Sequence, residues 1–178
     1  LSQTKEKMLF LKIINETVNF LEIPYGYKRN GRPPIGLDDM VKCCCIKVFN
    51  NFSTRRTVFE LQIAYALKYI NQIPHFNSIS NYLNKPEMTL YLQRLYTIIA
   101  LPLVEIENTF AIDSTGFGTF NKKKWVDIRP DRRERKDYKK LHIVSGVKTN
   151  VITSARITGG NKSDSPYFAD LVRESSFN

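Results

Sequence analysis

The sequence changes character at Thr109-Phe110-Ala111-Ile112-Asp113-Ser114-Thr115-Gly116. Upstream of this stretch apolar residues recur at helical spacing, whereas runs typical of β-strands follow it. Residues 109–112 predict a short apolar strand that ends at Asp113. A carboxylate at the end of a buried strand costs desolvation energy unless it is paired or binds a metal ion. Asp113 is therefore a candidate functional residue, although the same sequence equally allows it to cap the turn Ser114-Thr115-Gly116.

Downstream of this stretch, the pattern predicts two more strands and a helix. Residues 141–148 and 151–158 are expected to be strands, and Thr149-Asn150 between them predicts a hairpin. Asp164-Ser165-Pro166 has the composition of a helix start, with a capping residue and then proline in the first turn. We expect the buried side of this helix to carry Phe168, Leu171 and Val172.

Upstream of the stretch, the apolar spacing predicts a series of helices. The expected segments are residues 4–21, a helix after Asp38, a helix capped by Ser53, residues 78–83, and a longer helix with Pro86 in its first turn. The inward-facing residues are expected to include Met8, Leu11, Ile14, Val18, Leu21, Val41, Cys44, Cys45, Val48, Phe49, Phe59, Ile63, Leu67, Ile70, Met88, Tyr91, Leu92, Leu95 and Ile99. The fold class predicted is α+β, with a helical region over residues 1–101 and a mixed region over residues 102–178.

The composition excludes several classes of protein. Apolar residues make up 42% of the 178 residues and charged residues 25%, which is typical of globular proteins rather than disordered chains. No apolar run approaches the roughly 18 residues needed to span a bilayer. The three cysteines are adjacent, at positions 43–45, which fits neither a disulfide framework nor a zinc site. We interpret them as small core residues in a protein of a reducing, intracellular compartment.

The net charge indicates an anionic partner. Lys and Arg number 27 against 17 acidic residues, which gives a net charge of +10 and favours nucleic acid, with a merely soluble basic domain as the alternative. Residues 121–140 alone contain ten basic and four acidic residues. The short helices and tight turns upstream are compatible with a helix-turn-helix unit, and equally with a helical bundle of no particular function. Residue types that contact phosphates and base edges occur there at Arg55, Arg56, Asn77, Ser80 and Asn81.

An ordered series of motifs runs through the second part of the chain. In sequence order the motifs are AIDSTGF (111–117), Trp125, KKLH (139–142), GVKT (146–149) and NKSDSP (161–166). Together they resemble the start of the catalytic domain of insertion-sequence transposases of the DDE type. Upstream, GRPP (31–34) and STRR (53–56) resemble the N-terminal DNA-binding region of that family. The resemblance implies a ribonuclease-H-like fold, of which this chain holds an incomplete part, and the cutting and joining of transposon-end DNA.

The resemblance also implies which residues act. Asp113 matches the first metal-binding aspartate of the family, and the complete enzyme is expected to use Mg²⁺ or Mn²⁺. The second aspartate of the family follows a fourth strand and the glutamate lies on a later helix. Asp164 precedes the helix, so we interpret it as an N-cap rather than as the second acid. The chain thus resembles a truncated transposase, and we expect residues 1–178 alone to lack strand cleavage.

The expected partner is double-stranded DNA, both transposon ends and target. The bringing together of two DNA ends in this family implies a homo-oligomer, acting in a prokaryotic cytoplasm at the nucleoid and away from membranes. Trp125 could stack on an unpaired base or anchor its own loop. The residues expected to contact DNA are Arg32, Arg55, Arg56, Lys122, Lys123, Lys124, Trp125, Arg129, Arg132, Arg133, Lys139 and Lys140.

Two other functions remain open at this stage. The chain could be a non-catalytic helix-turn-helix protein or transposase remnant, but a pure regulator gives no reason for the acid at Asp113 or for the basic segment after it. A ribonuclease-H-like nuclease acting on RNA–DNA hybrids would fit the second part and would leave the helical part unexplained. His142 is interpreted as a packed or hydrogen-bonded histidine rather than as a ligand.

Overall fold

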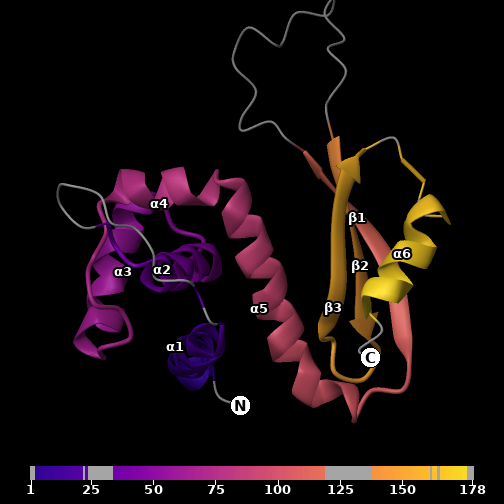
Figure 1. Cartoon of the computed structure of the whole chain (residues 1–178), viewed down its shortest axis with the longest axis horizontal. Coiled ribbons are helices and arrows are strands. Elements are labelled where there is room, and N and C mark those ends of the chain that lie inside the picture. The colour runs from indigo at the N-terminus through magenta and orange to yellow at the C-terminus, as the bar shows by residue number, and fades with distance from the viewer. Residues whose placement is uncertain are drawn as a thin grey trace, which may run out of the picture. The chain divides into compact units, whose positions relative to one another are not determined.

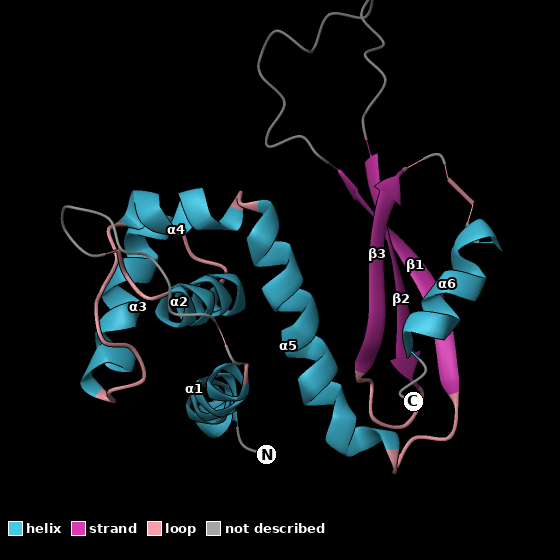
Figure 2. Ribbon diagram, in the orientation of Figure 1, coloured by secondary structure: helices cyan, strands magenta, loops and turns pink. Residues whose placement is uncertain are grey.

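A computed structural model describes residues 3–21, 23, 34–118, 138–160, 162–163 and 165–175 (Figure 1). Its elements, in chain order, are α1 (Gln3–Phe20), α2 (Leu37–Asn50), α3 (Thr54–Ala66), α4 (Phe76–Leu83), α5 (Pro86–Val104), β1 (Phe110–Gly118), β2 (Tyr138–Gly146), β3 (Ile152–Gly159) and α6 (Ser165–Ser175). Helices precede a single three-stranded sheet and its helix, as the secondary-structure colouring of Figure 2 shows, so the α+β class is confirmed. The chain divides into two compact units, residues 1–98 and 99–178, which are described separately.

The helical unit is built around α2. This helix contacts α1, α3 and α4, and α3 also contacts α4. The core residues Met40, Val41, Cys43 and Cys44 of α2 are fully buried. Burial raises the pKa of the Cys44 thiol to about 12, so that it stays protonated at neutral pH. The interpretation of the cysteines as core residues is therefore confirmed for Cys43 and Cys44.

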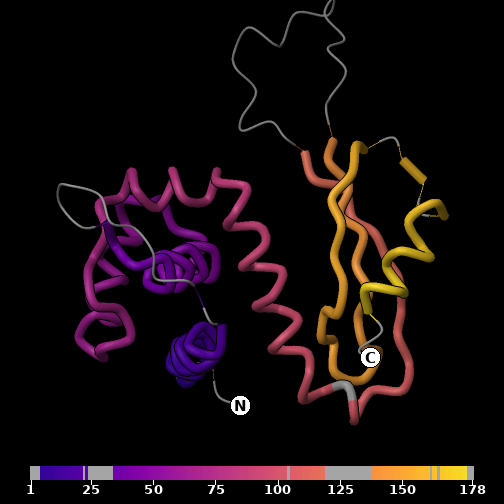
Figure 3. Tube along the Cα trace, viewed as in Figure 1, coloured from indigo at the N-terminus to yellow at the C-terminus, as the bar shows by residue number. Residues whose placement is uncertain are grey.

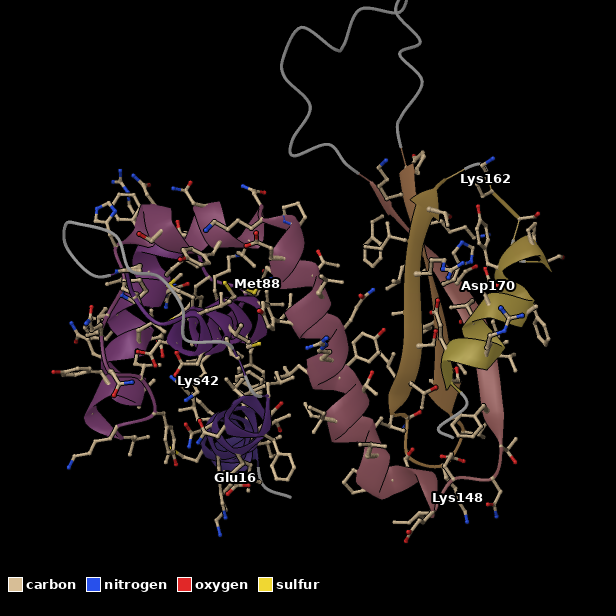
Figure 4. All side chains as sticks on the ribbon, viewed as in Figure 1. Glu16, Lys42, Met88, Lys148, Lys162 and Asp170 are labelled. Atoms are coloured by element: carbon tan, nitrogen blue, oxygen red, sulfur yellow. The ribbon has the colours of Figure 1, made fainter. Side chains whose placement is uncertain are left out.

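A buried lysine ties α1 to α2. Lys42 is 5% exposed, and its Nζ donates to Asn15 Oδ1 at 2.9 Å, to Asn19 Oδ1 at 3.2 Å and to the Tyr69 carbonyl at 3.0 Å. Figure 4 labels this residue among the helices of the unit. All three donors of the ammonium group thus have an acceptor, which offsets the cost of burying the charge.

Helix ends are predicted better than helix faces. Ser53 caps α3 by accepting from the Arg56 N–H at 3.4 Å, and α5 begins at Pro86, both as predicted. The buried side of α3, however, consists of Thr57, Leu61 and Ala64, because this is the side in contact with α2 and α4. Residues predicted to be buried that are exposed instead are Met8, Val48, Phe49, Phe59, Ile63, Leu67, Phe168 and Val172.

The sheet is antiparallel, in the order β1-β2-β3. The predicted hairpin between the second and third strands is confirmed, and Asn150 in its turn adopts a left-handed φ of 56°. Helix α6 packs against β3 and β2, with Leu171 1% exposed. Figure 3 follows this path from β1 through the hairpin to α6. Among the helices described, none is both long and apolar enough to cross a membrane.

Candidate functional site

Asp113 lies in the middle of β1, with its side chain exposed. The strand runs on from Asp113 to Gly118, which pairs with Tyr138 of β2. The predictions that Asp113 ends a buried strand, or caps a turn at Ser114-Thr115-Gly116, are therefore both wrong. Pairing with β2 keeps these residues extended, and the exposure of the carboxylate removes the desolvation argument.

The carboxylate of Asp113 keeps most of its capacity to bind a ligand. Its Oδ1 accepts the backbone N–H of Ser114 at 2.7 Å. Its Oδ2 makes no hydrogen bond to any residue that the structure describes. An exposed carboxylate oxygen of this kind suits a hard cation such as Mg²⁺. Within the described ranges, however, no three His, Cys, Asp or Glu side chains gather as a metal site.

The pleat of the sheet separates Asp113 from helix α6. On β2 the ring of His142 lies 5.1 Å from that of Tyr167 on α6, and on β3 Arg156 pairs with Asp170 at 2.7 Å. His142 therefore faces α6. Its neighbour Ile143, which is the cross-strand partner of Asp113, points to the other side of the sheet. Asp113 thus lies on the face opposite α6.

The two lysines at the start of β2 lie on opposite faces of the sheet, because neighbouring residues of a strand alternate between its faces. Lys139 pairs with Phe117 and so shares the face of Asp113, roughly 13 Å along the sheet from it. Lys140 pairs with Gly116 on the α6 face, and its Nζ donates to the Lys162 carbonyl at 3.3 Å. The structure thus places one of the two predicted DNA contacts, Lys139, on the same face as the carboxylate and the other on the opposite face.

Two further predicted DNA contacts lie in the first turn of α3. The Arg55 guanidinium is 4.8 Å from the Phe76 ring centroid of α4, and the Arg56 guanidinium is 4.0 Å from that of Phe52. Both residues are exposed, and the aromatic rings hold their cationic groups at the surface of the helical unit. The Arg55 contact fixes where its positive charge lies relative to α4.

The remaining predicted site residues lie outside the residues that the structure describes. They are Arg32, Lys122, Lys123, Lys124, Trp125, Arg129, Arg132, Arg133 and Asp164.

His142 is fully buried, and its Nε2 lies 2.8 Å from Thr158 Oγ1. It is therefore packed and hydrogen-bonded, as the sequence indicates.

Glu107 is a key residue that the sequence does not reveal. Its carboxylate, 4% exposed, accepts from the backbone N–H of Lys148 at 3.0 Å and from both the backbone N–H and the hydroxyl of Thr149 at 2.9 Å. Burial raises the pKa of Glu107, but these hydrogen bonds outweigh it and leave the pKa below its ordinary value. No local sequence motif predicts this contact, because the hydrogen-bond donors lie about forty residues downstream of Glu107.

Comparison with known families covers both units. Residues 1–85 match the family described as Transposase domain (DUF772), and residues 106–178 match the family described as Transposase DDE domain. Neither a curated protein nor a solved structure matches the chain. The two family matches occur in the order expected from the sequence motifs, and the strand order with its following helix is consistent with a ribonuclease-H-like DDE domain. Taken together, the two family matches support an insertion-sequence DDE transposase.

Proposed function

We propose that this transposase binds the DNA ends of its element through the helical region, residues 1–101, and that Asp113 is the first metal-binding carboxylate of the catalytic region, residues 102–178. The observation that supports the catalytic role is the exposed carboxylate of Asp113, with its Oδ2 directed to no described residue and Lys139 on the same face. A charged carboxylate and a cation on one open sheet face suit a phosphodiester substrate bound together with a cation.

Divalent metal, when bound, activates the attacking oxygen and stabilises the leaving oxygen in phosphoryl transfer. Asp113 would hold the metal through Oδ2, while the Ser114 N–H fixes the orientation of the carboxylate through Oδ1. Lys139 would attract the DNA backbone to this face. A single carboxylate is too few ligands for two ions, and no group of three or more His, Cys, Asp or Glu side chains among the described residues could hold a metal. We therefore propose that residues 1–178 alone bind DNA without cleaving it.

DNA binding is tested with fluorescently labelled duplexes of random sequence and increasing salt. We expect the affinity to fall steeply as salt rises, because the bound cations displace counterions from the phosphates. We also propose that the DNA-bound form is a dimer or larger, which sedimentation of the complex checks. Absence of DNA binding at low salt would refute the proposal for the helical region.

The role of Asp113 is tested by Mn²⁺ binding, followed by electron paramagnetic resonance. Asp113→Asn should weaken binding, whereas the matched change Glu105→Gln, at another exposed carboxylate of the same unit, should not. Equal affinities for all three proteins would remove Asp113 from the metal site and favour a non-catalytic DNA-binding protein. Plasmid nicking by residues 1–178 that Asp113→Asn abolishes would show that this chain cleaves DNA after all.

A further inference from the structure

Helix α4 has two chemically distinct faces. Ile79 is fully buried, and Phe76 and Leu83 on the same side are partly buried. The opposite side carries the exposed Asn77 and Asn81, and the exposed Asn84 follows the helix as its C-cap; we call these three asparagines the amide row. Their spacing of four and three residues places them on one face of the helix, one turn apart. Their side chains are exposed, and their amides make no hydrogen bond to the described residues.

The amide row is flanked by positive charge. At its first turn, the Arg55 guanidinium lies 4.8 Å from the Phe76 ring centroid. At its end, the Lys85 Nζ lies 3.9 Å from the Tyr82 ring centroid. No acidic residue occurs between Glu60 and Glu87, so nothing in this stretch of sequence neutralises the two cations. The surface therefore combines neutral amides in the middle with a cation at each end.

The dimensions of this surface fit duplex DNA. An α-helix with its side chains is about 10–12 Å in diameter, and the major groove of B-DNA, about 12 Å wide, admits one. The eight residues of α4 extend about 12 Å along the helix axis. An asparagine amide can donate to N7 and accept from N6–H of adenine at the same time only if its own groups are unused. Within the described part of the chain, the amides of the row are unused. Cations at both ends of the row would meet the phosphates that border the groove.

Helix α3 offers a more mixed surface. It exposes Arg55, Arg56 and Gln62, but also Phe59, 68% exposed, and Ile63, 39% exposed, which can make only apolar contacts to DNA. Helix α3 instead packs against α4 and so positions it.

We infer that α4 enters the major groove and reads base edges, with Asn77 and Asn81 selecting adenine, and that Arg55 and Lys85 contact the flanking phosphates. This inference rests on the DNA binding proposed above. It adds which helix recognises the bases and which base that helix prefers. Asn84, at the last position of the row, extends the contact by one turn.

The test begins with the selection of bound duplexes from a random pool by the whole 178-residue chain. We expect the enriched site to contain adenines at fixed positions. Each adenine is then replaced by 7-deazaadenine, which removes only the N7 acceptor. For the unmodified chain this should cost about tenfold in affinity at a contacted adenine. For Asn77→Ala or Asn81→Ala the same replacement should cost nothing at the corresponding position.

Matched variants distinguish base recognition from contact with the phosphates. Gln93→Ala, which removes an exposed amide from helix α5, should keep the sensitivity to 7-deazaadenine. Arg55→Gln should weaken binding to all duplexes by a similar factor and reduce the salt dependence, whereas Arg94→Gln on α5 should do neither. Circular dichroism of each variant confirms that the helices are intact.

The outcomes distinguish this inference from the proposed function. Failure of the unmodified chain to bind any duplex refutes the proposed DNA binding itself. Binding with no enriched adenines, or with a 7-deazaadenine effect that survives Asn77→Ala and Asn81→Ala, refutes the inference about α4 and leaves the DNA-binding function in place. Loss of the effect in the asparagine variants alone supports the inference.

Discussion

Glu107 accepts two hydrogen bonds from Thr149, one from the backbone N–H and one from the hydroxyl, both at 2.9 Å. The contact joins the segment before β1 to the turn between β2 and β3. It thereby fixes the start of β1, which carries Asp113, next to the end of β2, which carries its partner Ile143. Because Glu107 also accepts the Lys148 N–H, its carboxylate satisfies two backbone donors of the turn. The position of the candidate catalytic strand therefore depends on a residue outside the sheet.

Glu107→Gln should lower the melting temperature of the sheet unit at pH 7 and reduce its dependence on pH. The folded-state pKa of Glu107 is lowered, so its stabilising effect is present above the ordinary pKa of glutamate, about 4.3, and is lost as the pH falls through the lowered value. Thermal unfolding followed at pH 7 down to pH 3 checks this. Parallel curves for the two proteins across this range would contradict the assigned role.

Gly146→Ala should act on the same contact from the opposite side. A Cβ at Gly146 would collide with the Glu107 carboxylate, whereas one at Gly116 would meet nothing within 4 Å. We expect Gly146→Ala to destabilise the sheet unit and Gly116→Ala to have a much smaller effect, both measured by urea unfolding. Combining Gly146→Ala with Glu107→Gln should cost less than the sum of the two single changes. Additive effects would show that the two residues act independently.

How much of this fold the sequence predicts depends on how far along the chain each structural preference acts. Ser53 and Pro86 are recognisable because capping and first-turn preferences act within four residues. The sequence predicts wrongly that Phe59 is buried, because the apolar spacing of α3 allows more than one buried face. Contact with α2 and α4 selects the face that carries Leu61. The contact of Glu107 with Thr149 has no local signal at all.

The candidate site shows the same limit. Its central residue, Asp113, could be named from the sequence, but its environment could not, because the length of β1 is set by pairing with β2 rather than by its own residues. The separation of Lys139 from Lys140 requires only the two-residue period of a strand. The sequence does not predict this separation, because it places the start of the strand at residue 141, after both lysines. In the structure the strand starts at Tyr138.

Lys42→Met should destabilise the helical unit by about 1–3 kcal/mol. Methionine keeps most of the side-chain length but leaves the acceptors of Asn15, Asn19 and Tyr69 without their donor. Urea unfolding monitored by helical circular dichroism measures the change. Lys47→Met, at a partly exposed lysine of the same helix, is the matched control and should have little effect. Equal stability of Lys42→Met and the unmodified chain would show that the buried ammonium group contributes nothing.

Arg156→Ala should loosen α6 from the sheet. The guanidinium pairs with both Asp170 and Glu174 of α6, and Asp170 is labelled in Figure 4. Both pairs are partly exposed, so we expect a loss of roughly 1 kcal/mol that shrinks at high salt. Hydrogen exchange of the α6 amides checks this directly. Arg173→Ala, whose side chain is 81% exposed, serves as the control, and comparable exchange in the two variants would exclude a special role for Arg156.

Lys139→Gln should reduce the salt dependence of DNA binding by about one unit in the slope of log affinity against log salt, the effect of one lost phosphate contact. Lys140→Gln should leave the slope nearly unchanged, because its side chain lies on the α6 face and its Nζ donates to the Lys162 carbonyl. The two lysines are adjacent and equal in charge, so a general electrostatic attraction would affect both alike. DNA that lies on the Asp113 face of the sheet would contact Lys139 and not Lys140. Equal slopes for the two variants would place the DNA elsewhere, and a larger effect of Lys140→Gln would place it on the face covered by α6.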